Sequence, residues 1–558
     1  MSQASTETPG LLAQARIIAG DFEFSPEDVV KVAEHFVQVM KVSLTNDGPS
    51  QLPSFVTKLP RGDEKGVYFA VDLGGTNCRV CSVTLHGDST YTLLQSKHAV
   101  PSSLRINANY EPLFDFIAER IQEFRGAHPE TRQQDPNELE HVLPAVNEKR
   151  RQHFQKLGFT FSFTCEQHSL TRGTLLHWDK GWNIPSALGK DPCAMLQEAI
   201  DRIDMPIVVS ALANDSVGTL MTRSYSSQEK SRPLLGAIFG TGTNAAYIER
   251  LSNCTKLHNQ AEFQDFGSDD RMLINTEWGC FDNSLEVLPS TKYDHLLDKM
   301  SDQPGDQMLE KRVSGLYLGE LLRLAVLDLV QGGLFDMTVD SSSPLFQPGT
   351  LDSSVLTALA EDDSEHFNRS QSFLGKLLAA GGVSEADAHA IRLVSIAIAH
   401  RAARLAGASI AAIIIQTQVL QPRSPVSTPM KASIGEEIHP YSSTSKSATQ
   451  DFLQLFRRFI CKPFKLLSLC GLLGKSRTPP SLSSDHRVVQ NGNLGEDVID
   501  IGVDGSLIEF YPTFQQDIRE ALREVPDIGV EGEQKVRIGL VEHASAVGAA
   551  LMAQAAQV

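Results

Sequence analysis

Two segments of this chain share one construction: an apolar strand, a short loop of Gly, Thr and Asn, and a second strand. The first covers residues 66–85 and turns at 74–77, and the second covers 234–248 and turns at 240–244. Alternating apolar positions predict strands, and glycine-rich turns between them predict hairpins. Two such units suggest a duplicated α/β domain, although the stretch they share is only a few residues long.

The segments between these strands have helical periodicity. Apolar positions repeat at helical spacing over 316–330 and 386–408, and strands that alternate with helices favour α/β layers. Residues 1–60 predict a polar start and then one amphipathic helix, because Ser25 and Asp28 form a capping pattern before its apolar face. Residues 498–510 predict a strand that is broken at Asp504-Gly505-Ser506.

Charge and apolar content exclude several classes of protein. The formal net charge is −18, so the surface repels phosphate backbones and we expect no nucleic-acid partner. The start of the chain does not resemble a signal peptide, and the best apolar run, Leu405 to Ile415, is shorter than the ~18 residues of a membrane span. We therefore expect a soluble cytoplasmic protein with no transmembrane segment.

The eight cysteines are scattered along the chain, which is typical of reduced thiols inside the cell. Cys78 and Cys81 have the spacing of half a zinc or redox motif. They lie in a predicted strand, where positions three apart face opposite sides, and no second pair completes a metal site. We therefore interpret both as structural.

Residues 417–499 differ in amino-acid composition from the rest of the chain. Ser, Thr and Pro dominate 417–450, which predicts a disordered linker. Residues 451–477 carry six Lys or Arg, one Asp and many apolar side chains. This segment could contact a membrane surface or a protein partner. The alternatives are a poorly ordered insert or a translated intron.

The two Gly/Thr loops are candidate phosphate sites. Glycine lets backbone N–H groups approach phosphate oxygens, and threonine hydroxyls add donors. An ordinary hairpin turn is the alternative for one loop alone, but two related loops and the turn at 504–506 favour a nucleotide. The chain has neither a P-loop signature nor a dinucleotide-binding G-x-G-x-x-G after a strand.

Three carboxylates are candidates for catalysis or binding. Asp215 follows an apolar strand and precedes a helix, where it is either a helix cap or a base at a strand end. Glu277 lies among apolar residues, and Glu310 opens a helical run after Pro304-Gly305. From pattern alone, either glutamate could equally be a solvated surface residue.

Several long blocks carry a resemblance. They are YFAVDLGGTNCRVCSV, LGFTFSFTCEQ, GTLLHWDKGW, ALANDSVGTLM, GAIFGTGTNAAYIE, INTEWGCFDN, PGDQMLEKRVSGLYLGE and IGVDGSLIEFYP. Together they resemble the eukaryotic hexokinase/glucokinase family, with a texture most similar to fungal glucokinases. The resemblance covers about residues 20–416 and 498–552, so residues 417–499 interrupt an otherwise complete kinase.

The resemblance implies an actin-like (ribonuclease H-like) α/β fold with two domains around an interdomain cleft. We expect an N-terminal tail and helix (1–60), a small domain (61–225), a large domain (226–416), an insert (417–499), and the end of the large domain with a C-terminal helix (500–558). The implied activity is ATP-dependent phosphorylation of glucose, or of another hexose, at the 6-hydroxyl, the first step of glycolysis. ATP and Mg²⁺ are the implied cofactors, and no residue is assigned as a metal ligand.

The resemblance also assigns residues, position by position. Asp215 and Lys180 match catalytic positions, with Asp215 as the base. The positions that match sugar contacts are Ser162, Asp179, Lys180, Asn214, Asp215, Asn244, Glu277, Gln307 and Glu310. The positions that match nucleotide contacts are Asp72, Leu73, Gly74, Gly75, Thr76, Asn77, Arg79, Lys97, Gly240, Thr241, Gly242, Thr243, Gly505, Ser506 and Ser545.

Three positions depart from the family pattern. Thr164 replaces a proline beside Ser162, Asp179 replaces a threonine before Lys180, and His543 to Ala546 replaces a glycine-rich turn. An added carboxylate opposes an incoming phosphate, and lost glycines hinder close backbone approach. A second hypothesis follows from these changes: a hexokinase-like sugar sensor or regulatory protein with weak catalysis.

Overall fold

Two β-sheets built on one plan organise the fold. The computed structural model describes residues 10–131, 154–178, 181–227, 232–257, 267, 270–420 and 498–556. The first sheet has the strand order β4-β3-β2-β5-β8. Its strands are β2 (Lys65–Leu73), β3 (Asn77–His86), β4 (Tyr91–Ala99), β5 (Gln155–Phe161) and β8 (Ile207–Ala213). Strands β2, β3 and β4 run antiparallel, whereas β5 and β8 continue the sheet in parallel.

The second sheet repeats this arrangement. Its order is β1-β11-β10-β9-β14-β15, and apart from the two-residue edge strand β1 (Leu52–Pro53) it matches the first sheet strand for strand. Its strands are β9 (Pro233–Phe239), β10 (Thr243–Arg250), β11 (Arg271–Asn275), β14 (Ile499–Asp504) and β15 (Val536–Leu540). Strands β9, β10 and β11 are antiparallel, and β14 and β15 are added in parallel. The shared topology confirms the predicted duplication.

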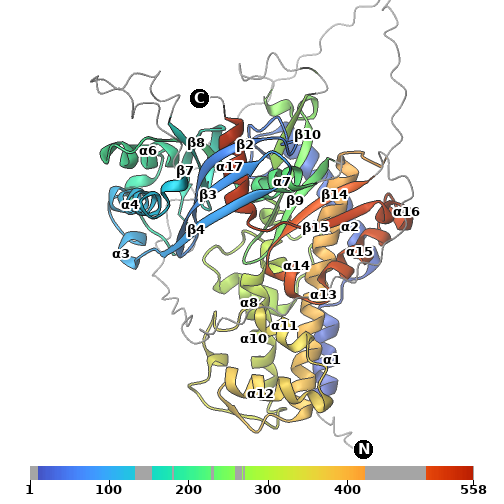
Figure 1. Cartoon of the computed structure of the whole chain (residues 1–558). Coiled ribbons are helices and arrows are strands. Elements are labelled where there is room, and N and C mark those ends of the chain that lie inside the picture. Colours follow the sequence, from blue (N-terminus) through green and yellow to red (C-terminus); the bar gives the residue numbers. More distant parts are fainter. Residues whose placement is uncertain are drawn as a thin grey trace, which may run out of the picture. The chain divides into compact units, whose positions relative to one another are not determined.

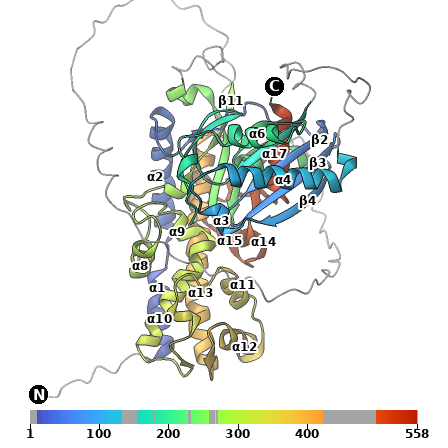
Figure 2. The same cartoon turned by 90° about the vertical axis from the view of Figure 1, so that its left-hand side faces the viewer.

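One face of the first sheet is covered by helices α4 (Glu111–Ala127) and α6 (Pro192–Arg202), as Figure 2 shows. Apolar side chains of β2, such as Phe69 and Val71, pack there against Leu113 and Ile117 of α4. This half also contains α3 (Ser102–Arg105) and a hairpin of β6 (Thr164–Ser169) and β7 (Arg172–His177). We call the first sheet with these elements the first half.

Two further helices each follow the last strand of one sheet and pack against the other sheet: the helix after the second sheet covers the other face of the first sheet, and the helix after the first sheet lies on the second sheet. Helix α7 (Asp215–Ser226) follows β8, and α17 (Ala544–Ala555) follows β15. They cross where Gly218 meets Gly548, since a Cβ added to Gly548 would lie 2.1 Å from the Gly218 Cα. The core around this crossing takes side chains from both sheets, so the crossing joins the halves (Figure 1).

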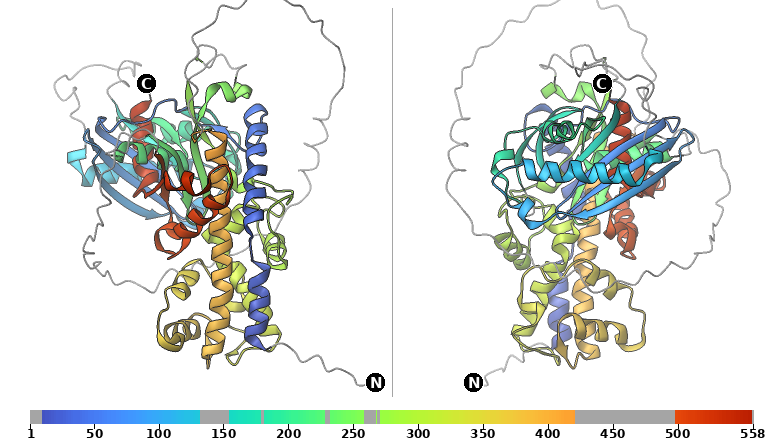
Figure 3. Two further views of the ribbon diagram at one scale, coloured as in Figure 1. Left: turned by 90° about the vertical axis from the view of Figure 1, so that its right-hand side faces the viewer. Right: turned by 60° about the vertical axis from the view of Figure 1, so that its left-hand side comes forward.

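The second half is the second sheet with a larger set of helices. The longest is α13 (Glu385–Gln416), and α1 (Leu11–Asp21) and α2 (Pro26–Thr45) lie alongside it (Figure 3). Among the described residues α13 alone has the length and composition of a membrane span, but 89% of its most apolar window is buried. The other elements are α8 (Lys292–Met300), α9 (Glu310–Val313), α10 (Gly315–Gln331), β12 (Thr338–Val339), α11 (Ser354–Ala360), α12 (Asn368–Leu377), β13 (Ala380–Gly381), α14 (Ser506–Phe510), α15 (Phe514–Glu524) and α16 (Gly529–Gln534).

Buried ion pairs fix these helices to one another. The Arg401 guanidinium of α13 donates to both carboxylate oxygens of Asp294 on α8, at 2.8 and 2.7 Å, and both side chains are almost fully buried. Burial alone would raise the pKa of Asp294, but Arg401 outweighs it and lowers that pKa to about 2. Arg404 makes a second two-pronged contact with Glu524 of α15.

Most predicted elements are present, with two differences. The capping box of Ser25 and Asp28 starts α2 as predicted, but an additional helix, α1, precedes it. Helix α1 begins at Leu11, and Gly10 in the N-cap position has no side chain to cap it, so the sequence carries no start signal there. The segment after Asp504 is helix α14 and not a continued strand, because Gly505 turns the chain with φ 116°.

The cysteine prediction is confirmed for the pair in β3. Cys78 packs in the core under α4 and α6, whereas Cys81 packs in the core under α7 and α17. Burial raises the pKa of each thiol to about 12. The two side chains therefore face opposite sides of the sheet.

Candidate active site

The loop between β9 and β10 is held from several directions. Helix α10 begins against it, because the backbone N–H of Gly315 donates to the Gly240 carbonyl at 2.7 Å and that of Leu316 to the Thr241 carbonyl at 3.1 Å. The indole N–H of Trp278 donates to the Thr243 hydroxyl at 3.1 Å. These bonds occupy backbone carbonyls and one hydroxyl, and the exposed Thr241 stays on the solvent side of the loop.

The turn after β14 lies directly against this loop. A Cβ added to Gly505 would lie 2.5 Å from the carbonyl carbon of Phe239 and 2.6 Å from the Gly240 nitrogen. Only glycine permits so close an approach, and the φ of 116° at Gly505 is likewise one that glycine alone adopts easily. The predicted nucleotide positions Gly240 to Thr243, Gly505 and Ser506 are thus brought together as one surface.

Amide and carboxylate side chains cluster next to this loop. The side-chain amide nitrogen of Asn275 donates to the Glu277 carboxylate at 2.7 Å, and that of Asn244 donates to the side-chain oxygen of Asn275 at 2.9 Å. Thr276 completes the group by donating its hydroxyl to the Asn244 side chain at 3.2 Å. Donors and acceptors alternate in this group, which is the pattern that recognises hydroxyl groups.

Gln307 and Glu310 approach the same group from the segment before α10. A Cβ added to Gly279 would lie 2.3 Å from the Gln307 Oε1, so the missing side chain makes room for the amide. The Glu310 carboxylate accepts the Thr243 backbone N–H at 3.3 Å. The predicted sugar positions Asn244, Glu277, Gln307 and Glu310 therefore adjoin the second loop.

Glu277 and Gln307 both have left-handed backbone conformations, with φ of 46° and 55°. For residues other than glycine this conformation costs about 1–2 kcal/mol each. Such strain persists only where the surrounding structure enforces it, and it concentrates at functional sites. Two strained residues within one polar group support a binding role for that group.

The loop between β2 and β3 has fewer anchors. The Gly74 N–H donates to the Asn77 carbonyl at 3.0 Å and closes the turn. The Trp182 indole donates to the Gly75 carbonyl at 2.7 Å, and the Ser162 N–H donates to the Leu73 carbonyl at 3.3 Å. Ser162, a predicted sugar position, is thus adjacent to the predicted nucleotide positions Leu73 to Asn77.

Asp215 is the first residue of α7, and Asn214 caps that helix. The Ser216 N–H donates to the Asn214 side chain at 3.0 Å and to the Asp215 carboxylate at 2.8 Å, so Asn214 is the cap residue and the adjoining Asp215 shares its donor. Asp215 lies near Asp504, the last residue of β14. Burial first, and then the negative charge of Asp215, raise the pKa of the Asp504 carboxyl, while His543 acts in the opposite sense.

The remaining predicted residues occupy several places. Arg79 pairs with the Asp72 carboxylate at 2.9 Å, and Lys97 is exposed on β4 opposite Arg79. Ser545 lies in the first turn of α17, where its carbonyl accepts the Thr160 hydroxyl at 3.2 Å. Asp179, Lys180 and the predicted contact segment 451–477 lie outside the described residues.

Several participants were not foreseen from the sequence. Asn275 connects Asn244 to Glu277, and Trp182 holds the first loop. Asn275 stands two positions before Glu277, but their contact depends on the left-handed turn at Glu277, which has no sequence signal. The proximity of Asp504 to Asp215 joins residues almost 300 positions apart.

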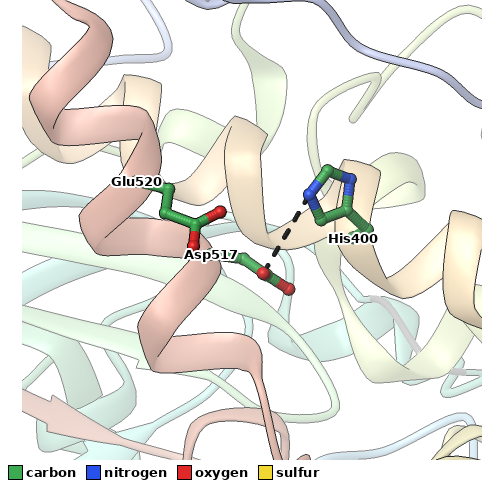
Figure 4. Close-up of side chains that lie close together, drawn as sticks. All are labelled: His400, Asp517 and Glu520. Carbon is green, nitrogen blue, oxygen red and sulfur yellow. Dashed lines mark ion pairs between the residues drawn. The ribbon is translucent and has the colours of Figure 1, made fainter.

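One other cluster of titratable side chains lies on α13 and α15, shown in Figure 4. His400, Asp517 and Glu520 place one ligand atom each within 4.8 Å of one another. Asp517 already accepts the Thr513 hydroxyl at 3.0 Å, and Glu520 accepts the Gln516 amide at 2.9 Å. The cluster therefore serves as a contact between the two helices.

Comparisons with known proteins show which family the chain is similar to. Two models described as hexokinase match the chain, one over residues 14–225 and the other over 234–466 and 467–555. A glucokinase of Aspergillus niger is 38% identical over 557 residues, covering 97% of both chains. Glucokinase-1 of Saccharomyces cerevisiae is 34% identical and covers 96% of this chain and 95% of its own. A hexokinase of Schistosoma mansoni complexed with glucose has a TM-score of 0.70 at 27% identity, covering 98% of this chain and 99% of its own.

Proposed function

The chain belongs to the hexokinase family, and we propose that it transfers the γ-phosphoryl group of ATP to the 6-hydroxyl of glucose. Its two domains carry the actin-like α/β fold of sugar kinases. The relatives named as glucokinases support glucose as the sugar.

A single observation carries the proposal: the group suited to a sugar and the loop suited to a phosphate share a hydrogen bond. The Glu310 carboxylate, beside Gln307, accepts the backbone N–H of Thr243 in the second loop. Phosphoryl transfer requires the acceptor hydroxyl and the phosphate within contact distance. This contact supports the proposal, because it would bring a bound sugar close to a bound phosphate.

Sugar recognition would rest on the group of Asn244, Glu277, Gln307 and Glu310. Glucose is uncharged and carries hydroxyls that both donate and accept, and this group offers amide donors beside carboxylate acceptors. An epimer with one hydroxyl misplaced would leave one of these partly buried groups unpaired, which costs about 1–3 kcal/mol. This cost is the basis for selecting one hexose over another.

Asp215 would act as the general base. Its carboxylate stands at the start of α7, close enough to Asp504 for its negative charge to raise the pKa of that carboxyl. The carboxylate accepts the proton of the 6-hydroxyl as that oxygen bonds to the γ-phosphorus, and ADP departs with the electrons of the broken bond. Asn214 is the cap residue of α7, and the Asp215 carboxylate accepts the Ser216 N–H at 2.8 Å, a bond that would orient it at the start of the helix.

The residues present fit a nucleotide. The Gly505 turn and the Gly240–Gly242 loop form adjoining glycine turns, with the exposed hydroxyls of Thr241 and Ser506 beside them. Backbone N–H groups of this kind hold phosphate oxygens. Mg²⁺, when bound with ATP, neutralises phosphate charge; the candidate carboxylates for holding it are Asp72 and Asp504, since one or two carboxylates usually suffice beside phosphates and water.

A coupled assay of the purified full-length chain with Mg-ATP and a panel of glucose, fructose and mannose tests the proposal. We expect turnover with glucose in the ordinary kinase range of about 1–100 per second. Glucose binding measured by calorimetry should accompany it. Glucose binding without turnover would contradict the proposal and would favour the alternative of a sugar-sensing regulator.

A further inference from the structure

A hydrogen bond joins the two halves of the fold on the side of the sugar group. The Gln303 amide nitrogen, from the segment before Gln307, lies 2.9 Å from the Nε2 of His177 at the end of β7. An amide nitrogen only donates, so the imidazole Nε2 accepts this bond and its proton resides on Nδ1. We propose that His177 and Gln303 form a latch that positions the two sugar-binding segments relative to each other.

On the first-half side, the latch continues to the first loop. Trp178 follows His177 directly and stacks on Trp182, with ring centroids 5.4 Å apart and planes 16° apart. The Trp178 indole donates to the Ile184 carbonyl at 2.9 Å, and the Trp182 indole donates to the Gly75 carbonyl at 2.7 Å. A displacement of His177 would therefore be transmitted to the loop that contains Gly75.

On the second-half side, the latch continues to the sugar group. The Lys311 ammonium, which is almost fully buried, donates to the backbone carbonyls of Gln303 and Asp306 at 2.7 Å each. It also pairs with Asp298 at 2.6 Å. Lys311 is the neighbour of Glu310, so the segment that carries Gln303 and the segment that carries Glu310 are fixed to one point.

The latch is therefore a bond between two supported ends. One end reaches a loop of the first half, and the other reaches the glutamate that contacts the second loop. The α7–α17 crossing also joins the halves, but its close contact is between Gly218 and Gly548. It does not involve the segments that carry His177 and Gln303. His177 and Gln303 act as positioning residues, because they would influence the sugar through Trp178 and Glu310.

This inference rests on the proposed function, since the sugar is what the positioned segments would bind. Double-mutant analysis of His177→Ala and Gln303→Ala tests it, with Gln303→Met as a variant that keeps the side-chain length but removes the donor. Glucose affinity is read from intrinsic fluorescence, because Trp178 and Trp182 are two of the three tryptophans. Steady-state kinetics on the same samples separates KM from kcat.

We expect each single change to weaken glucose binding about 3- to 10-fold, the scale of one lost hydrogen bond, with kcat changed less than about twofold. The double variant should bind glucose no more weakly than the more weakly binding single variant, because both changes remove the same contact. Exchanging the pair, as His177→Gln with Gln303→His, should restore most of the affinity.

His168→Ala is the matched control. His168 lies on the same hairpin, but its imidazole bonds the Thr174 hydroxyl within that hairpin at 2.8 Å, so its removal should leave glucose affinity unchanged. Wild-type affinity in both single variants, or effects that add in the double variant, would overturn the latch. A wild-type protein that binds glucose without turnover would refute the proposed function and leave this binding test valid.

Discussion

The two halves of the molecule use the same sheet for different tasks. In each, an antiparallel hairpin with a three-residue loop is extended by two parallel strands, and the last strand leads into a helix at the central crossing. In the first half that helix begins with Asp215, and in the second half it begins with Ala544. The shared frame therefore fixes where a helix starts, while the residue placed there decides what the half contributes.

The loops of the two halves differ in how firmly they are held. Helix α10, Trp278, Glu310 and Gly505 all contact the second loop, and α10 belongs to the helical assembly around α13. The first loop is held by its own turn, by the Trp182 indole and by the Val100 N–H, which donates to the Thr76 carbonyl at 2.9 Å. We infer a division of labour in which the second half forms a prebuilt sugar site and the first half supplies the base.

Removing the main buried ion pair should break the helical assembly that only the second half has. Arg401→Ala leaves the Asp294 carboxylate buried and unpaired, which should cost about 3–5 kcal/mol of unfolding free energy. Chemical denaturation measures this cost. Arg61→Ala, which removes an exposed arginine paired with Asp63, should change stability by less than about 1 kcal/mol.

The same pair predicts a pH dependence. The pKa of Asp294 is about 2 in the folded protein, below its ordinary value of about 3.9, so the pair contributes stability above pH 4. That contribution is lost as the pH falls from about 4 to about 2. The stability difference between the native protein and Arg401→Ala should narrow over this interval, and a constant difference would contradict the assignment.

Changing the carboxylates of the second half should weaken sugar binding. Glu277→Gln and Glu310→Gln each replace a charged acceptor, worth about 1.5–3 kcal/mol, which corresponds to about 10- to 150-fold in glucose affinity. Calorimetry measures the effect. Glu286→Gln, an exposed carboxylate nearby, is the control. Native glucose affinity in both site variants would show that Glu277 and Glu310 do not bind the sugar.

Gly548→Ala tests the junction between the halves. The added methyl would lie 2.1 Å from the Gly218 Cα, so α7 and α17 must separate, at a cost of about 1–3 kcal/mol. Gly20→Ala in α1 is the opposite case, because its Cβ meets nothing within 4 Å. That change should stabilise the protein slightly, and thermal unfolding of both variants shows whether the signs differ.

Trp182→Phe, which alters the less firmly held first loop, should have the smallest effect of these changes. The phenyl ring keeps the stacking but loses the bond to the Gly75 carbonyl, so the KM for ATP should rise about 2- to 10-fold. Trp178→Phe keeps an aromatic ring stacked on Trp182 and removes only the bond to the Ile184 carbonyl, which lies outside the loop, so it serves as the control. Equal effects of the two changes would mean that Trp182 does not support the loop specifically.

The sequence predicts the frame of the fold well where periodicity and turn chemistry agree. Both hairpins, the start of α2 and the helix from Glu385 are present as expected. The helix at Leu11 and the short helix after Gly505 were missed, because an uncapped start and a glycine turn give no periodic signal. The predicted domain ranges stay predictions. Helix α17, in the range predicted to end the large domain, lies against the first sheet, and α1 and α2, in the range predicted as an N-terminal tail and helix, lie along α13.

The candidate site was only partly accessible from the sequence. The local pattern does not distinguish Glu277 and Glu310 from surface residues, and only the resemblance groups them with Asn244 and Gln307. Asn275, Trp182 and the contact of His177 with Gln303 depend on left-handed turns and on long-range packing. Local patterns do not record such contacts, because each partner follows from the path of a distant segment.

Glucose affinity and turnover of Asp215→Asn, measured on one sample, test the division of labour most directly. This substitution keeps the size of the side chain and removes its ability to accept a proton. We predict a glucose dissociation constant within about threefold of the native value and a kcat lowered about 10²- to 10⁴-fold. Native-like turnover, or a loss of glucose binding as large as the loss of kcat, would contradict the account.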